Sequence, residues 1–349
     1  MNKELFAQHG IHCVVDGQFG STGKGVLAAW LAKLAVAKDI PFAGTFSNAG
    51  PNSGHTFYDG DEKHVLKQLP TFAVATHLLN KALTHDIILT AGAIIDPDIL
   101  AYEASKYPDI NIYVNPNAAI IRQQDKEAEH SGSVAAVAGT RSGTGVAIAR
   151  KVLREEDAVF GHFYNRNYGY FGRNVICGEP VRPQPFEYRY FMEVSQGFSL
   201  GIHSTFYPKV TSRECTVMQG IADARMPPSS VKRTYLSLRT FPIRVGDHEG
   251  FSSGDCYPDQ VETSWEALKQ KPELTTVTQR VRRVFTFSDM QAIAAIEAND
   301  PDFVFINFMN YLTDQGQRDM LERLDDIRDD RWFGVIGGWG PKSEDVRWL

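Results

Sequence analysis

The chain has few cysteines, no long apolar run and no excess of positive charge, and each shortage excludes a class of protein. Its 349 residues include four widely separated cysteines and no CxxC pair. A disulfide framework and a thiolate zinc site are therefore excluded, and the reduced thiols of a cytoplasmic protein are expected. No apolar run approaches the roughly 18 residues of a membrane span, and the first residues, MNKELFAQHG, contain no apolar signal segment.

The formal net charge of −6 is spread along the chain without an acidic or basic tail. A long nucleic-acid surface would be visible as a basic stripe, so neither a nucleic acid nor a membrane is expected as a partner. Any anionic ligand must be bound by local clusters of residues. The length and the 43% content of hydrophobic residues are sufficient for a large buried core.

Apolar segments predict an α/β fold, because short strand-like runs alternate with segments of helical periodicity. The expected strands are 11–15, 85–97 (ending in a turn), 110–116, 186–194, 235–245, 303–309 and 332–338, and the expected helices are 26–38, 96–107, 123–138, 146–155 and 291–300. This alternation predicts a mostly parallel central sheet covered by helices. We expect residues 1–349 to form a single large α/β domain with inserted helical and loop subregions.

The first candidate site is the stretch DGQFGSTGKG at 16–25, between an expected strand and an expected helix. Such an arrangement directs backbone N–H groups and a helix N-terminus at an anion. The spacing is not that of a Walker A loop, because Gln18 stands where the first glycine belongs and Gly25 where the hydroxyl residue belongs. Lys24 at the helix start favours phosphate binding over the alternative, a simple tight turn.

Four further stretches combine turn residues with hydrogen-bonding side chains. They are NAGPNSGHTF (48–57), which presents His55, GTRSGTG (139–145), EVSQGFSLGIHSTFYPKVTS (193–212) and TTVTQRVRRV (275–284). The second could form another anion cradle or a linker, and the arginines of the last could clamp a carboxylate or phosphate or lie on a solvated surface.

The order of these motifs resembles the adenylosuccinate synthetase family over most of the chain. The resemblance implies that family's P-loop-related fold, a Mg²⁺ cofactor and a homodimer. It also implies a ligase that forms a C–N bond: a nucleoside triphosphate phosphorylates O6 of a purine monophosphate, and the amine of L-aspartate then displaces phosphate. Two nucleotides and a dicarboxylate must be held together, which explains the number of cradles and arginines.

Carried over by position, the resemblance assigns roles to particular residues. Ser21, Lys24, His55 and Gln196 would be catalytic, with Lys24 stabilising the transferred phosphate and His55 acting as general acid and hydrogen-bond partner at O6. Mg²⁺ would be bound by the main chain of Gly54 and by Ser21. The nucleotides would be bound by Gly20, Ser21, Thr22, Gly23, Lys24, Gly25, Asn52, Gly54, His55, Thr56, Thr140, Gln196, Thr211, Asn307, Asn310, Gly340 and Pro341. Aspartate would be bound by Thr276, Thr278, Arg280 and Arg282. An arginine from the other subunit is also implied, and the spacing leaves Arg150 and Arg154 as candidates.

The family loop is normally GDEGKG, and its aspartate, which removes the N1 proton of the base, is replaced here by Ser21. A serine hydroxyl has too high a pKa to act as that base unaided. Either catalysis is lost or the acceptor is a different purine. Ser21 could lie beside a 2-amino group, and GSTGKG resembles the phage branch of the family, the aminodeoxyadenylosuccinate synthases, which act on dGMP to supply 2-aminoadenine for viral DNA. The setting would then be the host cytoplasm.

The family's TKLD motif, whose aspartate recognises the guanine of GTP, corresponds here to FINFMN (305–310), which has no acidic residue. Asn307 or Asn310 could pair with adenine instead, so ATP or dATP is the expected donor. Phe305, Phe308 and Met309 are expected to be core residues. The stretch GGWGPK (337–342) resembles the family's STGPDR loop near the donor base.

The leading hypothesis is a ligase that joins L-aspartate to C6 of dGMP with hydrolysis of ATP or dATP. The alternatives are a standard synthetase acting on IMP with GTP and a non-catalytic nucleotide-binding protein. The sequence leaves open the choice between ATP and dATP, the strictness for a deoxy acceptor and the group that replaces the missing base.

Overall fold

The computed structural model describes residues 5–130, 140–167, 169–180, 187–247, 250–275, 279–327 and 334–349. Within these ranges the central element is a ten-stranded sheet that is parallel except for β17 at one edge. Across the sheet the strands are β17 (Val346–Trp348), β16 (Gly334–Gly338), β15 (Phe303–Asn307), β11 (Val231–Arg239), β1 (Gly10–Asp16), β10 (Arg189–Glu193), β2 (Gly44–Ser47), β5 (Asp86–Leu89), β7 (Ile112–Val114) and β9 (Val175–Cys177).

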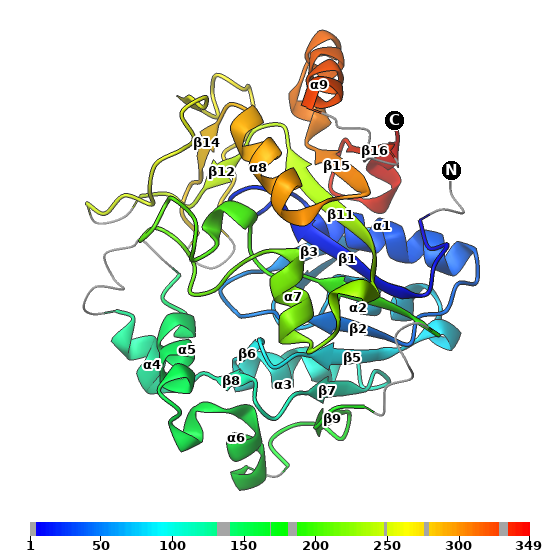
Figure 1. Cartoon of the computed structure of the whole chain (residues 1–349), viewed down its shortest axis with the longest axis vertical. Coiled ribbons are helices and arrows are strands. Elements are labelled where there is room, and N and C mark those ends of the chain that lie inside the picture. Colours follow the sequence, from blue (N-terminus) through cyan, green and yellow to red (C-terminus); the bar gives the residue numbers. More distant parts are fainter. Residues whose placement is uncertain are drawn as a thin grey trace.

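Helices cover both faces of this sheet, and β1 shows why. All seven residues of β1 are buried, with Val14 in one hydrophobic core and Ile11, Cys13 and Val15 in the other. A strand covered on both faces is buried along its whole length and is mostly apolar, with His12 and Asp16 as the polar residues of β1. The first core includes residues of α1 (Lys24–Ala37), α2 (Thr71–Leu79) and α3 (Pro97–Lys106), and the second includes residues of α7 (Val217–Asp223), α8 (Asp289–Asn299) and α9 (Asp314–Ile327). Figure 1 shows α7 and α8 in front of the sheet. The expected α/β class is confirmed.

Smaller elements flank the main sheet. An antiparallel hairpin joins β3 (His55–Asp59) to β4 (Glu62–Leu66), and a small antiparallel sheet joins β12 (Ile243–Arg244), β14 (Arg283–Phe285) and β13 (Glu262–Thr263). The remaining elements are the paired β6 (Ile94–Ile95) and β8 (Ala119–Ile120) with α4 (Gln123–Ala128), α5 (Thr144–Val152) and α6 (Phe160–Arg166). None of the helices in the described ranges is long and apolar enough to span a membrane.

Three of the expected elements differ from the structure. The strand expected over 85–97 is divided into β5 and β6, which belong to different sheets. The strand expected over 235–245 is divided into β11 and β12, because the chain turns at Thr240 and Pro242 has no N–H for the ladder. The helix expected over 123–138 is described only as far as 130, and α4 ends at Ala128. The predicted cap of α3 is present, since the side chain of Asp96 accepts hydrogen bonds from the backbone N–H groups of Asp98 and Ile99.

Candidate active site

A cavity of about 530 Å³ lies where β1, β11 and β15 end and the loop after β10 begins. The strand register brings these ends together, because Asp16 pairs with Ser237, Arg239 with Asn307 and Val14 with Glu193. The crevice at the carboxyl ends of parallel strands is the usual ligand site of open α/β sheets. Its volume is in the range of small-molecule sites.

The cavity collects most of the residues that the motifs predicted, from segments distant in the sequence. Its lining includes Gly20, Ser21, Thr22, Gly23, Lys24, Gly25, Asn52, Gly54, His55, Thr56, Thr140, Gln196, Arg282, Asn307, Asn310, Gly340 and Pro341. Two predicted residues are not part of it: Thr211, whose amide donates to the carbonyl oxygen of Leu200, and Arg280, which lines a neighbouring surface cavity. The predicted Thr276 and Thr278 lie outside the described residues.

The phosphate loop (residues 17–23) is organised by the buried carboxylate of Asp16. Its oxygens accept hydrogen bonds from the backbone N–H groups of Gln18 (2.9 Å), Gly20 (3.3 Å) and Thr22 (3.3 Å), and from the Thr22 hydroxyl (2.7 Å). In an ordinary P-loop the backbone N–H groups surround the phosphates. Here a carboxylate of the protein itself occupies part of that cradle, which accounts for the unusual spacing of the motif.

Gln18, which stands where a Walker loop begins with glycine, fastens the loop to β11. Its side chain accepts from the backbone N–H of Arg239 (3.0 Å) and donates to the carbonyl oxygen of the same residue (3.2 Å). A glycine could not form this clamp. The replacement therefore has a structural reason.

Gly23 and Gly25 permit two close approaches at the start of α1. A Cβ at Gly23 would lie 2.0 Å from the side-chain nitrogen of Asn307, and one at Gly25 would lie 2.8 Å from the carbonyl oxygen of Thr56. The hydroxyl residue of a Walker loop is thus excluded at Gly25 by the hairpin that carries His55.

Lys24 begins α1 and is buried at the base of the cavity. Its ammonium donates to the carbonyl oxygens of Val194 (2.8 Å) and Gln196 (2.6 Å), which leaves one of its N–H groups for a ligand. Burial lowers its pKa, and Asp16 partly opposes this shift. An anion bound beside Lys24 would stabilise the charged form of its side chain. The position therefore favours phosphate binding.

His55 begins β3 and faces the same cavity. Burial, together with the charge of Lys24, lowers its pKa to about 3. The imidazole is therefore neutral in the free protein at neutral pH. A neutral imidazole offers a ligand one N–H donor and one acceptor nitrogen, and a bound anion beside it would raise its pKa.

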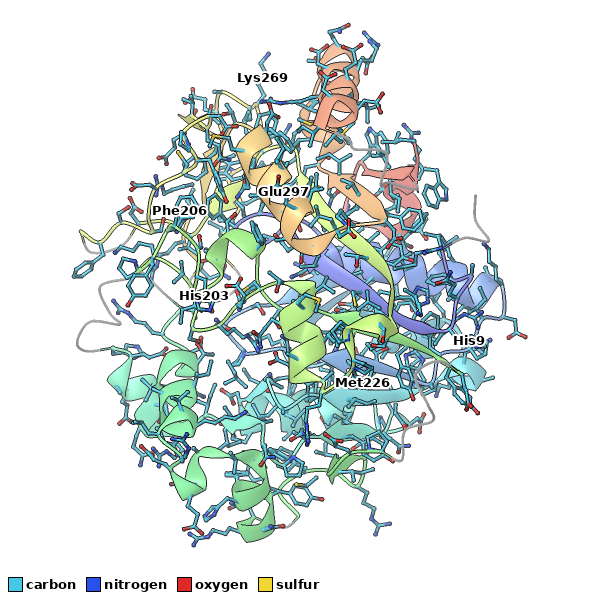
Figure 2. All side chains as sticks on the ribbon, viewed as in Figure 1. His9, His203, Phe206, Met226, Lys269 and Glu297 are labelled. Carbon is cyan, nitrogen blue, oxygen red and sulfur yellow. The ribbon has the colours of Figure 1, made fainter. Side chains whose placement is uncertain are left out.

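Two more predicted residues meet across the cavity. Gln196, in the left-handed region with φ of 66°, donates to the side chain of Asn52 at 2.9 Å. Gln196 opens the loop that continues past His203 and Phe206, both labelled to the left of the sheet in Figure 2. The Phe206 ring packs edge-on against Phe19, with 5.1 Å between the ring centroids, so this loop contacts the phosphate loop.

The turn after β15 corrects the expectation that Phe308 is a core residue and shows which hydrogen bonds Asn307 already makes. Asn307 lines the cavity, but its side-chain nitrogen donates to the carbonyl oxygen of Thr22 (3.3 Å) and its oxygen accepts from the backbone N–H of Phe308 (2.8 Å). It therefore braces the turn and is a poor candidate for recognising a base. Phe308 is half-buried and lines the cavity, whereas Phe305 and Met309 are core residues as expected.

The arginine loop begins at Glu273, which lines the cavity with Thr275 and Arg282. Burial lowers the pKa of Arg282 to about 10, and Glu273 partly offsets this effect. Burial also disfavours the charge of Glu273, but Arg239 and Arg282 hold its pKa below the usual value. The loop thus places the positive charge of Arg282 near the ion pair of Glu273 and Arg239. This arrangement is suited to a carboxylate ligand.

Arg150 and Arg154, the two candidates for an arginine contributed to the other subunit, differ in their environments. Arg150 is buried and donates to Asp125, Glu155 and Asp157 of its own chain. Arg154 follows α5 and is exposed. Arg150 thus holds α4 and α5 to the segment that follows them.

Some lining residues were not among the predicted site residues, although several stand within the motifs: Asp16, Phe19, Val245, Glu273, Thr275, Phe308 and Tyr311. Asp16 stood at the start of the first motif, and an acidic residue at a strand end was the available signal. For Glu273 no local pattern existed, because its partner Arg239 lies 34 residues earlier.

Comparison with known proteins shows that the chain is similar in sequence to synthases and synthetases of purine nucleotides. The chain is 36% identical over 341 residues to the N6-succino-2-amino-2′-deoxyadenylate synthase of Cyanophage S-2L, covering 95% of this chain and 91% of that protein. It is 32% identical to the synthase of Vibrio phage phiVC8, with 96% and 97% covered, and 26% identical to the adenylosuccinate synthetase of Pyrococcus sp. (strain ST700), with 85% and 83% covered. No family model matches the chain.

Solved structures agree with these relatives. The Cyanophage S-2L succinoaminodeoxyadenylate synthetase, bound to dGMP and dATP as an energy donor, superposes with a TM-score of 0.86 at 34% identity, covering 98% of this chain and 95% of that one. The fully ligated adenylosuccinate synthetase from Plasmodium falciparum gives 0.74 at 14% identity, covering 98% and 100%, and shares the fold.

Proposed function

The chain belongs to the N6-succino-2-amino-2′-deoxyadenylate synthases of the adenylosuccinate synthetase family, and from this premise we propose that it joins L-aspartate to C6 of dGMP. The γ-phosphate of dATP or ATP is transferred to O6, and the aspartate amine then attacks C6 and displaces phosphate. The products are N6-succino-2-amino-2′-deoxyadenylate, the nucleoside diphosphate and phosphate. It is a ligase that forms a C–N bond.

The observation that carries this proposal is the similarity over nearly the whole chain to a synthetase solved with dGMP and dATP. The cavity is consistent with it. At the loop position where the family has its catalytic aspartate, this chain places Ser21, with φ of 56° and an exposed side chain. A hydroxyl there can accept a hydrogen bond from the 2-amino group of guanine.

Lys24 and His55 supply the groups that phosphoryl transfer to O6 requires. The ammonium of Lys24 offsets charge on the transferred phosphate, and the imidazole of His55 donates a hydrogen bond to O6. Asp16 is a carboxylate near Ser21 in sequence, but its oxygens are engaged by the loop. In this arrangement it shapes the loop rather than removing the N1 proton.

The cavity fits a Mg²⁺ ion that is bound mainly by substrate oxygens. In the described part of the chain, no group of three or more His, Cys, Asp or Glu residues could hold a metal. Mg²⁺ often takes only one or two protein oxygens and completes its shell with water and phosphate oxygens. Gly54 and Ser21 line the cavity and would provide the protein oxygens. A Mg²⁺ bound there would neutralise charge on the phosphates.

The donor base is assigned to the turn after β15. Phe308 and Pro341 line the cavity from two different loops and offer apolar surfaces on which an adenine can stack. Asn310 is exposed at the same wall, and its amide can pair with adenine N6 and N7. Dimerisation is part of the proposal, with Arg154 as the arginine that would reach the partner's site. The host cytoplasm is the proposed setting, since the relatives come from phages.

A panel of acceptors and donors tests the proposal. Purified protein with Mg²⁺ is mixed with dGMP, GMP or IMP, with dATP, ATP or GTP, and with or without L-aspartate, and phosphate release and product mass are measured. Release that requires both dGMP and aspartate, with dATP or ATP, is expected. Turnover restricted to IMP and GTP would identify a standard adenylosuccinate synthetase. Binding without phosphate release from any combination would identify a non-catalytic nucleotide-binding protein.

A further inference from the structure

Arg239 is a fully buried arginine at the centre of the site, yet it is not part of the cavity wall. It is the last residue of β11 and its side chain is 0% exposed. Its guanidinium forms a two-point ion pair with Glu273, at 2.6 and 3.2 Å, and also donates to the carbonyl oxygen of Ser21 at 3.1 Å. The guanidinium carbon Cζ lies over the Phe308 ring, 3.9 Å from the ring centroid.

The three partners of Arg239 belong to three different walls of the cavity. Ser21 lies in the phosphate loop, Glu273 begins the arginine loop, and Phe308 is in the turn after β15. Tyr311 completes the group, since its hydroxyl donates to Glu273 at 3.1 Å. One side chain is therefore in contact with the walls assigned to the acceptor, to aspartate and to the donor base.

The backbone is strained at two of the residues that Arg239 contacts, Ser21 and Phe308. Ser21 has φ of 56° and Phe308 has φ of 62°, in the left-handed region that is unfavourable for residues other than glycine. Both carbonyls accept hydrogen bonds from the end of β11: Arg239, its last residue, donates to the carbonyl of Ser21, and the hydroxyl of Thr240, the next residue, donates to the carbonyl of Phe308 at 2.9 Å. Asn307 holds the neighbouring carbonyl of Thr22.

Stability alone does not explain a charge in this place. Burying an ion pair costs desolvation that its Coulomb attraction often only balances, so an apolar side chain of the same size would commonly serve as well. A planar guanidinium can do what an apolar group cannot, because it holds a carboxylate at two points, donates to a carbonyl and stacks on an aromatic ring.

We propose that Arg239 is a positioning residue that fixes the Ser21 peptide relative to the Phe308 ring and so aligns the acceptor with the phosphate donor. The proposal rests on the proposed function of the cavity. In-line phosphoryl transfer depends on such alignment, and misplacement by about 1 Å can reduce the rate about 100-fold. Arg239 touches no substrate and acts through the walls that do.

The test compares Arg239→Met and Arg239→Lys with a matched control, Arg233→Met. Arg233 lies on the same strand and is paired with Asp302 at 3.3 Å, away from the cavity. For each variant, thermal unfolding is followed, and kcat and the KM values for dGMP and dATP are measured. Arg239→Met is expected to raise both KM values about tenfold and lower kcat about 100-fold. Arg239→Lys, which keeps the charge but loses the planar contacts, should recover part of kcat. Arg233→Met should change unfolding alone.

A double variant separates positioning from a general loss of structure. Phe308→Leu should raise the KM for dATP and leave that for dGMP nearly unchanged. Added to Arg239→Met, it should raise the KM for dATP by less than about twofold further, because both changes disturb the same contact. A folded Arg239→Met protein with kcat and both KM values within twofold of the parent would overturn the proposal. If Arg239→Met does not fold, Arg239→Lys decides the matter by the same criterion.

Failure of the proposed function would be recognised separately. The parent protein would then turn over another acceptor, or would bind nucleotides without turnover. In the first case the same variants are measured with that acceptor. In the second, calorimetric titration of dATP with and without dGMP replaces the kinetics, and the coupling between the two nucleotides should be lost in Arg239→Met but kept in Arg233→Met. Unchanged coupling would again contradict the role of Arg239.

Discussion

At the scale of single residues, the site differs from a carboxylate-based synthetase by the exchange of acidic groups for neutral ones. Ser21 stands in the phosphate loop where the family has aspartate, and Asn310 lines the cavity at the wall proposed for the donor base, in a turn without acidic residues. Both side chains are exposed to the cavity. Because exposed side chains can usually be exchanged with little effect on the fold, each change can be reversed and its effect on selectivity measured.

Ser21→Asp should shift acceptor preference from dGMP toward IMP, because the carboxylate restores a base for the N1 proton of hypoxanthine. The ratio of kcat/KM for IMP to that for dGMP is expected to rise at least tenfold. Steady-state phosphate release with each acceptor measures it. Ser21→Ala is the control, since it removes the hydroxyl without adding a base. An unchanged ratio in Ser21→Asp would mean that Ser21 does not face the 2-amino group.

Asn310→Asp should bring GTP into use as a phosphate donor. A carboxylate accepts from guanine N1 and N2, whereas the amide suits adenine. Discrimination by one such pair is about 1–3 kcal/mol, so the preference for dATP over GTP should fall by about one order of magnitude or more. Competition between the two donors at saturating dGMP gives the ratio. A preference that does not change would remove Asn310 from the donor site.

His55→Ala should lower kcat by about 100-fold or more while the Kd for dATP changes by less than about threefold. The pKa of about 3 for His55 predicts a second property. The kcat/KM of the parent protein should show no titration of this histidine between pH 5 and 7.5, since the free protein already holds it neutral. An acidic limb near pH 6.5 that disappears in His55→Ala would contradict the assignment.

At the scale of elements, two sets of hydrogen bonds hold the phosphate loop. The carboxylate of Asp16 accepts from the loop backbone, and the side chain of Gln18 bonds to the backbone of Arg239 at the end of β11. Asp16→Asn removes acceptor capacity from a buried group with several donors. Unfolding free energy should fall by about 1–3 kcal/mol, and the KM values for dGMP and dATP should rise several-fold. Asp96→Asn is the matched control, because Asp96 is a buried carboxylate that caps α3 away from the cavity. It should lower stability and leave both KM values unchanged. Equal KM changes in the two variants would contradict a specific role for Asp16.

The elements also show what sequence can and cannot predict. The unit of β1, phosphate loop and α1 was predictable because strand, glycines and helix are adjacent in the chain and each has a local signal. The position of Ser21 followed from the motif alone. Phe308 was misjudged as a core residue because alternation in a strand predicts which side chains are buried, whereas the turn at Phe308, with its left-handed backbone, rotates the ring into the cavity. The pairing of Arg239 with Glu273 depends on how β11 meets a loop from another sheet, and no spacing encodes it.

At the scale of the whole molecule, buried histidines should make the fold sensitive to acid. His12, packed between Phe6 and Phe42, and His85, bonded to Thr45, are buried, and burial lowers the pKa of each to about 4. The unfolded chain therefore binds protons that the folded chain does not, from about pH 6.5 downward. The stability they contribute is complete above pH 6.5 and is lost as the pH falls toward 4, by about 3 kcal/mol for each histidine. Glu193 opposes this trend, because burial raises its pKa to about 7. The unfavourable ionisation of the buried carboxyl therefore lowers the stability of the fold as the pH rises from 4.5 to 7.

The histidines outnumber Glu193 in this balance, so a net loss of stability below pH 6.5 is expected. Urea unfolding at intervals from pH 7.5 to 4.5 measures it. His12→Leu fills the same apolar site without a titratable group and should flatten the profile by about 3 kcal/mol over that range, whereas His9→Leu, at an exposed position, should leave the slope as it is. A profile that keeps its slope in His12→Leu would show that another group governs the acid sensitivity of the molecule.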